Sequence, residues 1–150
     1  MLWQLYLRNG TVYVPTVAQT EAGYYMDIEP VEAVSATDTG ALEHAIKEAM
    51  SKGNPIVPTP RRATFPKPVV LKHANVKSWS AFEKGTLNWT IVGKSGNYQI
   101  KPGRKRPDKG WEEDPAKIES LPPGTTLDEV ARRVVALVQL SVSVASPNVG

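Results

Sequence analysis

The stretch LWQLYLRNGTVYV, residues 2–14, contains two short runs of leucine, valine and aromatic residues on either side of Asn9 and Gly10. Valine and aromatic side chains are favoured in strands, and an Asn-Gly pair tolerates the positive φ angles of a two-residue hairpin turn. The stretch therefore predicts an antiparallel β-hairpin at the start of the chain. It is the strongest local indication of structure in the sequence, and the other expected elements are placed around it.

Residues 24–29 alternate between apolar and polar side chains, which is typical of a strand with one face in water. This alternation predicts that Tyr24 faces the protein and that Asp27 and Glu29 face solvent. Pro30 has no amide hydrogen to give to a neighbouring strand. We therefore expect the strand either to end at this proline or to lie at an edge of the sheet.

Two later segments also have the composition of strands. Residues 86–101 alternate on both sides of the turn-forming sequence Lys94-Ser95-Gly96-Asn97, and this pattern predicts a second hairpin. The short apolar run Val69-Val70-Leu71 predicts a further strand. His73 would then lie at the end of that strand.

Apolar residues recur at helical spacing after Asp38 and Thr39. Either of these two residues can accept a hydrogen bond from the first turn and so cap the helix. Gly53 follows the last apolar position and can end the helix in a left-handed conformation. The pattern predicts a first amphipathic helix between these residues.

A second amphipathic helix is predicted over roughly residues 126–140, where apolar side chains again share one face. Thr126 lies three residues before Glu129, which is the spacing of a capping box. The following sequence, SVSVASPNVG, has the composition of a short strand or of a frayed end. We expect fraying from Ser146, because Pro147 and Gly150 have little to pack against.

Together these elements predict an α+β fold: a largely antiparallel sheet built from hairpins, with two amphipathic helices packed on it. A chain of 150 residues is long enough to bury one core, so we expect a single domain over residues 1–150. Five prolines between Pro55 and Pro68 exclude regular structure from most of that segment. The proline-rich connector is expected over residues 54–68, and the frayed tail over residues 146–150.

The chain contains no cysteine, which excludes disulfides, thiolate nucleophiles and zinc–cysteine sites. The first ten residues lack the basic region and the uninterrupted apolar run of a secretion signal. The longest mainly apolar run is shorter than the roughly 20 residues that cross a bilayer. We therefore expect a cytoplasmic protein with no membrane partner.

The charge is distributed unevenly along the chain. Residues 1–60 carry three basic and seven acidic side chains, residues 61–110 carry twelve and two, and residues 111–150 carry three and six. The middle third is thus strongly basic although the whole chain has a net charge of only +3. Such asymmetry can mark a binding surface for a polyanion, or the acidic parts can neutralise the basic part within the fold.

The first alternative is a nucleic-acid-binding module that uses the basic region of residues 61–110. Five of its charges lie between Lys101 and Lys109, in a stretch expected to be a loop that three acidic residues partly shield. The candidate polyanion-binding residues are Arg61, Arg62, Lys101, Arg104, Lys105, Arg106 and Lys109.

The sequence contains no recognisable set of catalytic residues. His44 lies on the predicted outer face of the first helix, and neither it nor His73 belongs to a spaced set of metal ligands. A catalytic role for His73 with Ser78 or Ser80 would need a carboxylate from elsewhere in the chain. We expect no catalytic residues, no metal site and no cofactor.

The small cysteine-free α+β chain, without a catalytic set, contains the stretches VKSWSAFEKGTLNWTI (76–91) and LPPGTTLDEVARRVV (121–135). In these features it resembles small bacterial immunity proteins, which neutralise a partner toxin. The resemblance implies a non-enzymatic, protein-binding inhibitor whose partner is a secreted toxin domain. Immunity proteins against nucleases tend to present acidic residues, whereas the middle third here is basic.

Acidic residues for such a partner would come from two regions of the chain, together with a tryptophan between a basic and an acidic run. Trp111 is either an anchor for its loop or an exposed contact residue. The candidate partner-binding residues are Asp27, Glu29, Trp111, Glu112, Glu113 and Asp114.

Overall fold

The predicted N-terminal hairpin forms and lies near the middle of the sheet. In the computed structural model, which describes residues 1–145, β1 (Leu2–Arg8) pairs antiparallel with β2 (Thr11–Thr20). The φ angles of Asn9 and Gly10 are 51° and 78°, as a turn of two left-handed residues requires. The prediction of this hairpin is confirmed.

The sheet has eight strands, and its main path follows the order β3-β2-β1-β5-β6-β7. β4 pairs with β2 in parallel, β8 pairs with β6, and all pairings other than β2–β4 are antiparallel. The predicted α+β fold with a largely antiparallel sheet is confirmed. The strands that join the first hairpin are β3 (Tyr25–Ser35), β4 (Ile56–Val57), β5 (Leu87–Lys94), β6 (Asn97–Lys105), β7 (Trp111–Glu113) and β8 (Glu119–Ser120).

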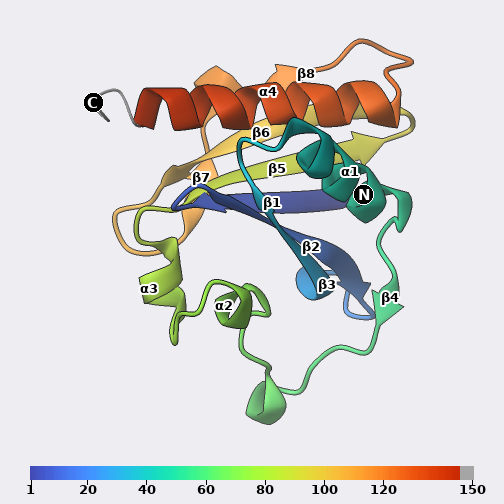
Figure 1. The fold of residues 1–150 in the computed structure, drawn as a ribbon. Helices are drawn as coiled ribbons and strands as arrows, with labels where there is room; N and C mark the ends of the chain where they lie inside the picture. Colours follow the sequence, from blue (N-terminus) through green and yellow to red (C-terminus); the bar gives the residue numbers. More distant parts are fainter. Residues whose placement is uncertain (146–150) are drawn as a thin grey trace.

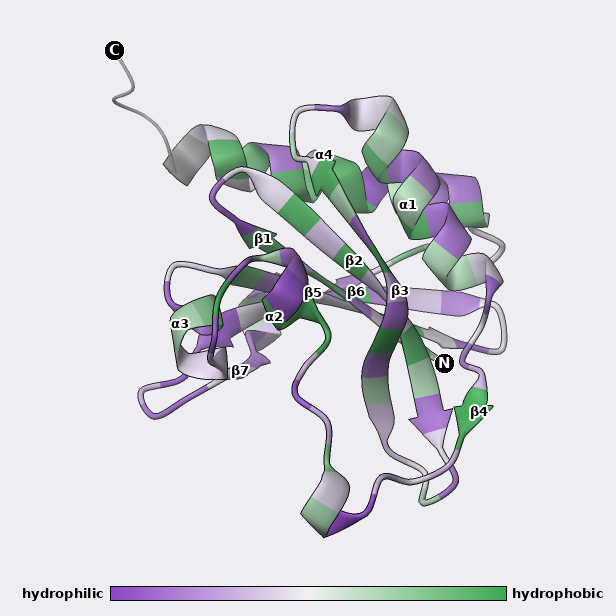
Figure 2. Cartoon of the chain, turned by 60° about the horizontal axis from the view of Figure 1, so that its bottom comes forward, coloured by the Kyte–Doolittle hydropathy of each residue, from purple (hydrophilic) through white to green (hydrophobic). Residues whose placement is uncertain are grey.

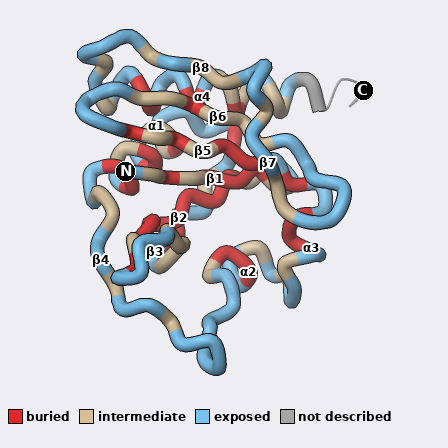
Figure 3. The backbone as a smooth tube through the Cα atoms, turned by 180° about the vertical axis from the view of Figure 1, so that it is seen from behind, coloured by how far each residue is buried: buried red, intermediate tan, exposed pale blue. Residues whose placement is uncertain are grey.

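Two long helices, α1 (Thr39–Ser51) and α4 (Leu127–Ala145), pack together against one face of the sheet (Figure 1). Their apolar stripes and the strands beneath them form the main core, in which Leu42, Ile46 and Val134 are fully buried. Figure 3 shows this core as buried segments of α1, α4 and the central strands. Both predicted amphipathic helices are confirmed.

The ends of the helices follow from their capping residues. The Asp38 carboxylate accepts a hydrogen bond from the Ala41 amide at 3.1 Å, so Asp38 caps α1. Before α4, the Glu129 amide donates to the Thr126 hydroxyl oxygen, and the Thr126 amide donates to the Glu129 carboxylate. This reciprocal pair is the predicted capping box.

α4 is longer than predicted. It includes residues 141–145, for which a short strand or a frayed end was expected. Val142 packs against the main core, and this tertiary contact offsets the modest helix penalty of valine and serine. The expected fraying from Ser146 concerns residues 146–150, which lie outside the described part of the chain.

The opposite face of the sheet carries a second, smaller cluster that the sequence did not predict. Two short helices, α2 (Val70–His73) and α3 (Trp79–Glu83), cover it on the side away from α4 (Figures 1 and 3). Their buried side chains include Leu71 and Phe82, which join Tyr6 and other residues of the strands. We call this group the aromatic cluster. The buried residues of the aromatic cluster are Tyr6, Tyr13, Val31, Val70, Leu71 and Phe82.

The strand predicted at residues 69–71 is wrong, because this run lies in and next to α2. The Leu71 amide donates to the Pro68 carbonyl and the Ala74 amide donates to the Val70 carbonyl, so the run closes a helical turn. A short apolar run has no periodicity that separates a buried strand from a buried helical turn. His73 consequently ends a helix and not a strand.

β3 lies at an edge of the sheet, as Pro30 suggested, but it does not end there. Its ladder with β2 shifts register between Thr16, which faces Ile28, and Pro15, which faces Val31. Glu29 and Pro30 therefore sit in a bulge without ladder partners, where the missing amide hydrogen of proline removes no sheet hydrogen bond. The strand continues beyond the bulge as far as Ser35.

The connector of residues 54–68 contains little regular structure, in agreement with its five prolines. It contributes β4 and a short 3₁₀ helix, η1 (Arg62–Thr64), and then leads to α2. Figure 2 shows its course between β4 and α2, beyond the far ends of β2 and β3. Within the described residues, no helix has the length and apolar character of a bilayer-spanning segment.

The capping box gives a first prediction. Replacing Thr126 by alanine removes the hydroxyl that accepts from the Glu129 amide, so the free energy of unfolding should fall by about 1 kcal/mol. Urea denaturation followed by circular dichroism measures this loss. Arg132→Ala, at an exposed position of α4, is the matched control and should change stability by less than about 0.5 kcal/mol. Equal losses in the two variants would contradict the assigned cap.

Candidate functional site

An open pocket of about 640 Å³ lies beside the aromatic cluster, between the edge strand β3 and the end of the connector. β1, β3, β5, β7 and α3 contribute to its walls, together with connector residues 65–68 and Val69. We call it the connector pocket. It contains three of the predicted site residues, namely Asp27, Glu29 and Trp111.

One wall of the connector pocket consists of three aromatic rings. Trp79 and Trp111 meet edge to face with their centroids 5.7 Å apart, and Tyr6 lies 6.1 Å from the first and 5.9 Å from the second. Edge-to-face contacts at such distances are favourable. The wall is therefore a packed aromatic surface and not a set of independent side chains.

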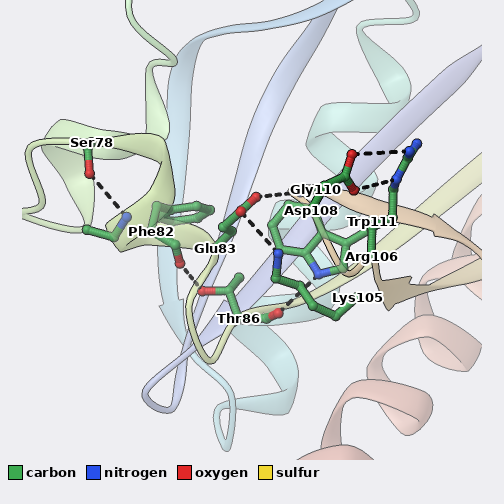
Figure 4. Close-up of polar contacts among 10 residues, drawn as sticks. Ser78, Phe82, Glu83, Thr86, Lys105, Arg106, Asp108, Gly110 and Trp111 are labelled. Carbon is green, nitrogen blue, oxygen red and sulfur yellow. Dashed lines mark hydrogen bonds and ion pairs between the residues drawn. The ribbon is translucent and has the colours of Figure 1, made fainter.

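Trp111 is an anchor of its hairpin and is also partly accessible from the pocket. Its indole Nε1 donates to the Thr86 carbonyl at 3.2 Å (Figure 4). On β6, a Cβ atom at Gly103 would lie 3.0 Å from the Trp111 Cβ, so a larger residue would require Trp111 to shift by a few tenths of an ångström. Trp111 thus anchors its hairpin, which was one of the two alternatives, and it is also half-exposed to the pocket. Its contact with a partner stays a prediction.

Asp27 lines the pocket and is half-buried, so it is less exposed than a residue that simply faces solvent, as predicted, would be. The Tyr6 hydroxyl donates to its Oδ2 and the Gln4 side-chain amide donates to its Oδ1, each at 2.7 Å. Burial raises the pKa of Asp27 to about 6, although these two hydrogen bonds lower it in part. The same burial, together with the Asp27 charge, raises the pKa of Tyr6 well above its ordinary value.

The alternation does not separate a buried face from an exposed face here, because Tyr25, Met26, Asp27 and Ile28 are all half-buried. Tyr25 packs against the main core, while Met26 and Ile28 line the connector pocket with Asp27. Tyr24, which was predicted to face the protein, precedes the strand and is 41% exposed. Alternation identifies a buried face only when the other face is in water.

Glu29 lies at the rim of the pocket and is exposed, as predicted. Its carboxylate forms ion pairs with Lys72 Nζ at 2.6 Å and with His73 Nε2 at 2.9 Å. The hydrogen bond from Lys72, aided by His73, lowers the pKa of Glu29. These contacts connect the edge strand to α2 beside the pocket.

The His73–Glu29 pair brings a carboxylate to the histidine but provides no catalytic triad. The Ser78 hydroxyl accepts from the Ala81 amide and caps α3, and within the described residues no serine or threonine hydroxyl bonds to His73. The same part of the chain contains no cluster of side chains that could hold a metal ion.

The second acidic group does not line the connector pocket. Glu112 pairs with Arg104 at 3.1 Å, and Glu113 pairs with Lys101 at 3.0 Å. Asp114 accepts from the Ala116 amide at 3.3 Å and caps η2 (Pro115–Lys117). The structure thus brings Asp27, Glu29 and Trp111 together, whereas contact of the other three acids with a partner stays a prediction.

The basic stretch after residue 100 forms the β6–β7 hairpin, so residues 101–105 lie in a strand where a loop was expected, and residues 106–110 form the turn. Lys101 to Lys105 belong to β6, which continues because it pairs with β7 beyond the end of its ladder with β5. Pro102 and Gly103 lie within this strand. Pro102 and Pro107 exclude a helix, but Pro102 lies opposite Trp89 at the end of the ladder with β5, and Pro107 comes after β6, so neither prevents the strand.

Four of the seven candidate polyanion-binding residues form ion pairs within the chain. Besides Lys101 and Arg104, Lys105 pairs with Glu83 at 3.0 Å and Arg106 pairs with Asp108 at 3.1 Å (Figure 4). For the other three, no ion pair occurs within the described residues. These three residues are Arg61, Arg62 and Lys109.

Sequence reasoning missed Glu83, which connects the β6–β7 hairpin to α3. Its buried carboxylate accepts from Lys105 Nζ at 3.0 Å and from the Gly110 amide at 2.7 Å (Figure 4). Burial alone would raise the pKa of Glu83, but these hydrogen bonds lower it below its ordinary value. No local pattern in the sequence pairs Glu83 with residues more than twenty positions away.

Sequence reasoning also missed Gln4 and Tyr6, although a signal was present. In the first strand they alternate with Trp3, Leu5 and Leu7, which face the main core. An amide and a phenol on the second face of a central strand indicate a covered but partly polar surface. That surface is the floor of the connector pocket.

Comparisons with known proteins show a shared fold but no family. No protein-family model matches the chain, and no curated protein matches it. A protein of unknown function from Neisseria meningitidis, NMB0488, has a similar structure, with a TM-score of 0.65, 14% sequence identity and coverage of 95% of both chains. A chain of the CdiA-CT/CdiI toxin and immunity complex from Yersinia pseudotuberculosis is also similar, with a TM-score of 0.62, 15% identity and coverage of 93% of this chain and 95% of that chain.

The raised pKa of Asp27 gives a second prediction. As the pH falls, the folded state should take up a proton near pH 6 and the unfolded state only near pH 4. The protonated carboxyl thus contributes stability that is fully present below about pH 4 and is lost as the pH rises through about 6. Relative to Asp27→Asn, the parent should gain about 2 kcal/mol between about pH 7 and about pH 4, after allowance for partial exposure to solvent.

Urea denaturation at a series of pH values measures this difference, and the ¹³C resonance of the Asp27 carboxyl group reports its titration directly. Glu32→Gln removes an exposed carboxylate from the same strand and is the matched control. Parallel stability curves for the parent and Asp27→Asn would contradict the assigned environment of Asp27.

Proposed function

We propose that this chain is a bacterial immunity protein, which acts in the cytoplasm by binding and neutralising a protein toxin. The observation that carries the proposal is the fold that it shares, over nearly the whole length of both chains, with a chain of a toxin and immunity complex. The identity of 15% supports the fold only. The argument for a binding role therefore comes from the connector pocket.

The chemistry of the connector pocket suits a protein partner. Trp79 and Trp111 are partly exposed on its wall, and Phe65, which is 57% exposed, lies on the connector side. Aromatic side chains around a concave surface are enriched at the centres of protein interfaces. Glu29, Lys72 and His73 give this surface a charged rim.

A binding role also fits what the polar groups of the pocket do. Glu29 and His73 are engaged with each other, and Asp27 is held by Tyr6 and Gln4. These contacts hold the surface in one shape but align no nucleophile with a base. An inhibitor requires a preformed surface of this kind and no reaction.

The alternative, a nucleic-acid-binding module, has less support from the geometry. Neutralising phosphates requires basic side chains that release counterions, and four of the seven candidates are already paired with acids of the chain. The basic middle third is thus partly neutralised from inside the fold. We keep nucleic-acid binding as an outcome of the tests.

The function is tested with the protein encoded next to this chain in its genome. Co-expression of the two proteins should restore growth to cells that the neighbouring protein alone kills, and the purified proteins should form a complex. A neighbour that is not toxic, or a toxic neighbour that this chain neither binds nor neutralises, would contradict the proposal. Fluorescence anisotropy with labelled DNA and RNA is the parallel test, and binding that weakens steeply with added salt would favour the alternative.

Variants of the pocket give a third prediction. Trp111→Ala should weaken binding of the toxin by about 2 kcal/mol or more if the indole is a central anchor. Glu29→Gln, at the exposed rim, should mainly slow association and reduce its dependence on salt, whereas Asp27→Asn, inside the pocket, should mainly speed dissociation. Surface-immobilised binding kinetics measure both effects, and circular dichroism shows whether each variant is folded.

The exposed residue Lys94, in the turn between β5 and β6, provides the control Lys94→Ala, which should bind like the parent. Glu112→Gln and Glu113→Gln test the acidic residues outside the pocket. If Trp111→Ala and the two pocket charge variants all bind as tightly and as fast as the parent, the connector pocket is not the interface.

A further inference from the structure

Asp27 differs from the other enclosed carboxylate of the protein. Glu83 is buried and has a lysine at 3.0 Å, whereas both hydrogen bonds to Asp27 come from neutral groups, the Tyr6 hydroxyl and the Gln4 amide. Within the described residues, no basic side chain forms an ion pair with Asp27. The connector pocket thus contains a carboxylate without a cation.

A carboxylate has more capacity to accept hydrogen bonds than Asp27 uses. Its two oxygens offer about four lone-pair positions, and Oδ1 and Oδ2 each receive one side-chain donor. An ionised carboxylate away from bulk water is disfavoured unless a proton or a cation compensates its charge. An incoming group with several N–H donors and a positive charge would satisfy both requirements.

The walls beside Asp27 have the shape and chemistry for the stem of such a group. The half-exposed rings of Trp79 and Trp111 offer aromatic surface to a planar cation, and Met26 and Ile28 offer apolar surface to methylene groups. A guanidinium group stacks on aromatic faces and binds carboxylates through two parallel hydrogen bonds. A free carboxylate next to an aromatic wall is therefore the complement of an arginine side chain.

The other charged groups around the pocket are paired elsewhere or exposed to water, so they do not compensate the charge of Asp27. Glu29, on the same strand, is engaged by Lys72 and His73 of α2. Lys67, on the connector, lines the pocket but is exposed, so its ammonium group can remain in water. Tyr6, on β1, donates its proton to Asp27 and adds no charge.

We propose that the connector pocket receives an arginine side chain of the partner protein, with its guanidinium group on the Asp27 carboxylate and its flat face against the aromatic wall. This inference rests on the proposed function, because the arginine belongs to the neutralised toxin. A chain whose middle third is basic would thus bind a basic group of its partner at this pocket. Charge complementarity at Asp27 specifies the occupant.

The indole signals of the full chain test this inference without the toxin. Two of the four tryptophans, Trp79 and Trp111, line the pocket, and the other two, Trp3 and Trp89, lie in the main core as internal controls. The probes are a blocked glycine-arginine-glycine peptide and its citrulline counterpart, which has nearly the same shape but no charge. A ¹H–¹⁵N correlation spectrum follows each indole during the titration.

The arginine peptide should shift the signals of Trp79 and Trp111 but not those of Trp3 and Trp89, and citrulline should have little effect. Asp27→Asn should abolish the difference between the two peptides. Because Asp27 takes up a proton near pH 6, binding should weaken about tenfold between about pH 7.5 and about pH 5. His73→Gln should show the same weakening with pH as the parent, because His73 bonds to Glu29 and not to Asp27.

Equal shifts by the arginine and citrulline peptides, absence of any shift, or undiminished discrimination in folded Asp27→Asn would each overturn the assignment of arginine to Asp27. The peptide comparison and the pH series in the parent chain need no variant, so a folding defect of Asp27→Asn leaves the test decisive. The proposed function is judged separately by growth rescue. Rescue without peptide binding removes this inference alone, and peptide binding without rescue removes the proposed toxin as the source of the arginine.

Discussion

The alternation of side chains along β1 is the constraint on which both faces of the protein depend. Its odd-numbered residues Trp3, Leu5 and Leu7 enter the main core beneath α1 and α4, while Gln4 and Tyr6 point to the other side. β1 is paired on both edges, with β2 and with β5, so its register cannot shift without exposing one of these surfaces. One central strand thus determines where the core lies and where the connector pocket lies.

The elements predicted correctly are those whose signal is local. Asn9-Gly10, the turn at residues 95 and 96, and the capping residues Asp38 and Thr126 each specify a backbone conformation through their neighbours in sequence. The element predicted wrongly depends on distant residues: the run at residues 69–71 becomes helical where it packs on the aromatic cluster. The sequence left open whether β3 ends at Pro30 or lies at an edge, and only its pairing with β2 decides this, because a bulge at Glu29 and Pro30 lets the edge strand continue.

In the candidate site, too, the features that depend on single residues were predicted and those that depend on distant contacts were not. Its residue types were identifiable, since Asp27, Glu29 and Trp111 were all selected from the sequence, but their common pocket was not. The hydrogen bonds that hold Asp27 span 21 and 23 positions, and the pair between Glu29 and His73 spans 44. The charge pattern was misleading for a related reason: Glu112 and Glu113 neutralise basic side chains across neighbouring strands and Glu83 does so from α3, which a count along the chain cannot show.

The environment of Asp27 connects stability to recognition. At neutral pH the protein holds an ionised carboxylate where burial disfavours the charge, so the free chain is less stable than it would be with a neutral group there. A cation on Asp27 would reverse this effect by favouring the ionised form and returning its pKa toward the ordinary range. Binding would then release protons at pH values near 6 and would stabilise the fold by the same coupling. Packing alone would favour an uncharged side chain at this position, so the proposed arginine contact would account for a destabilising carboxylate between Tyr6 and Gln4.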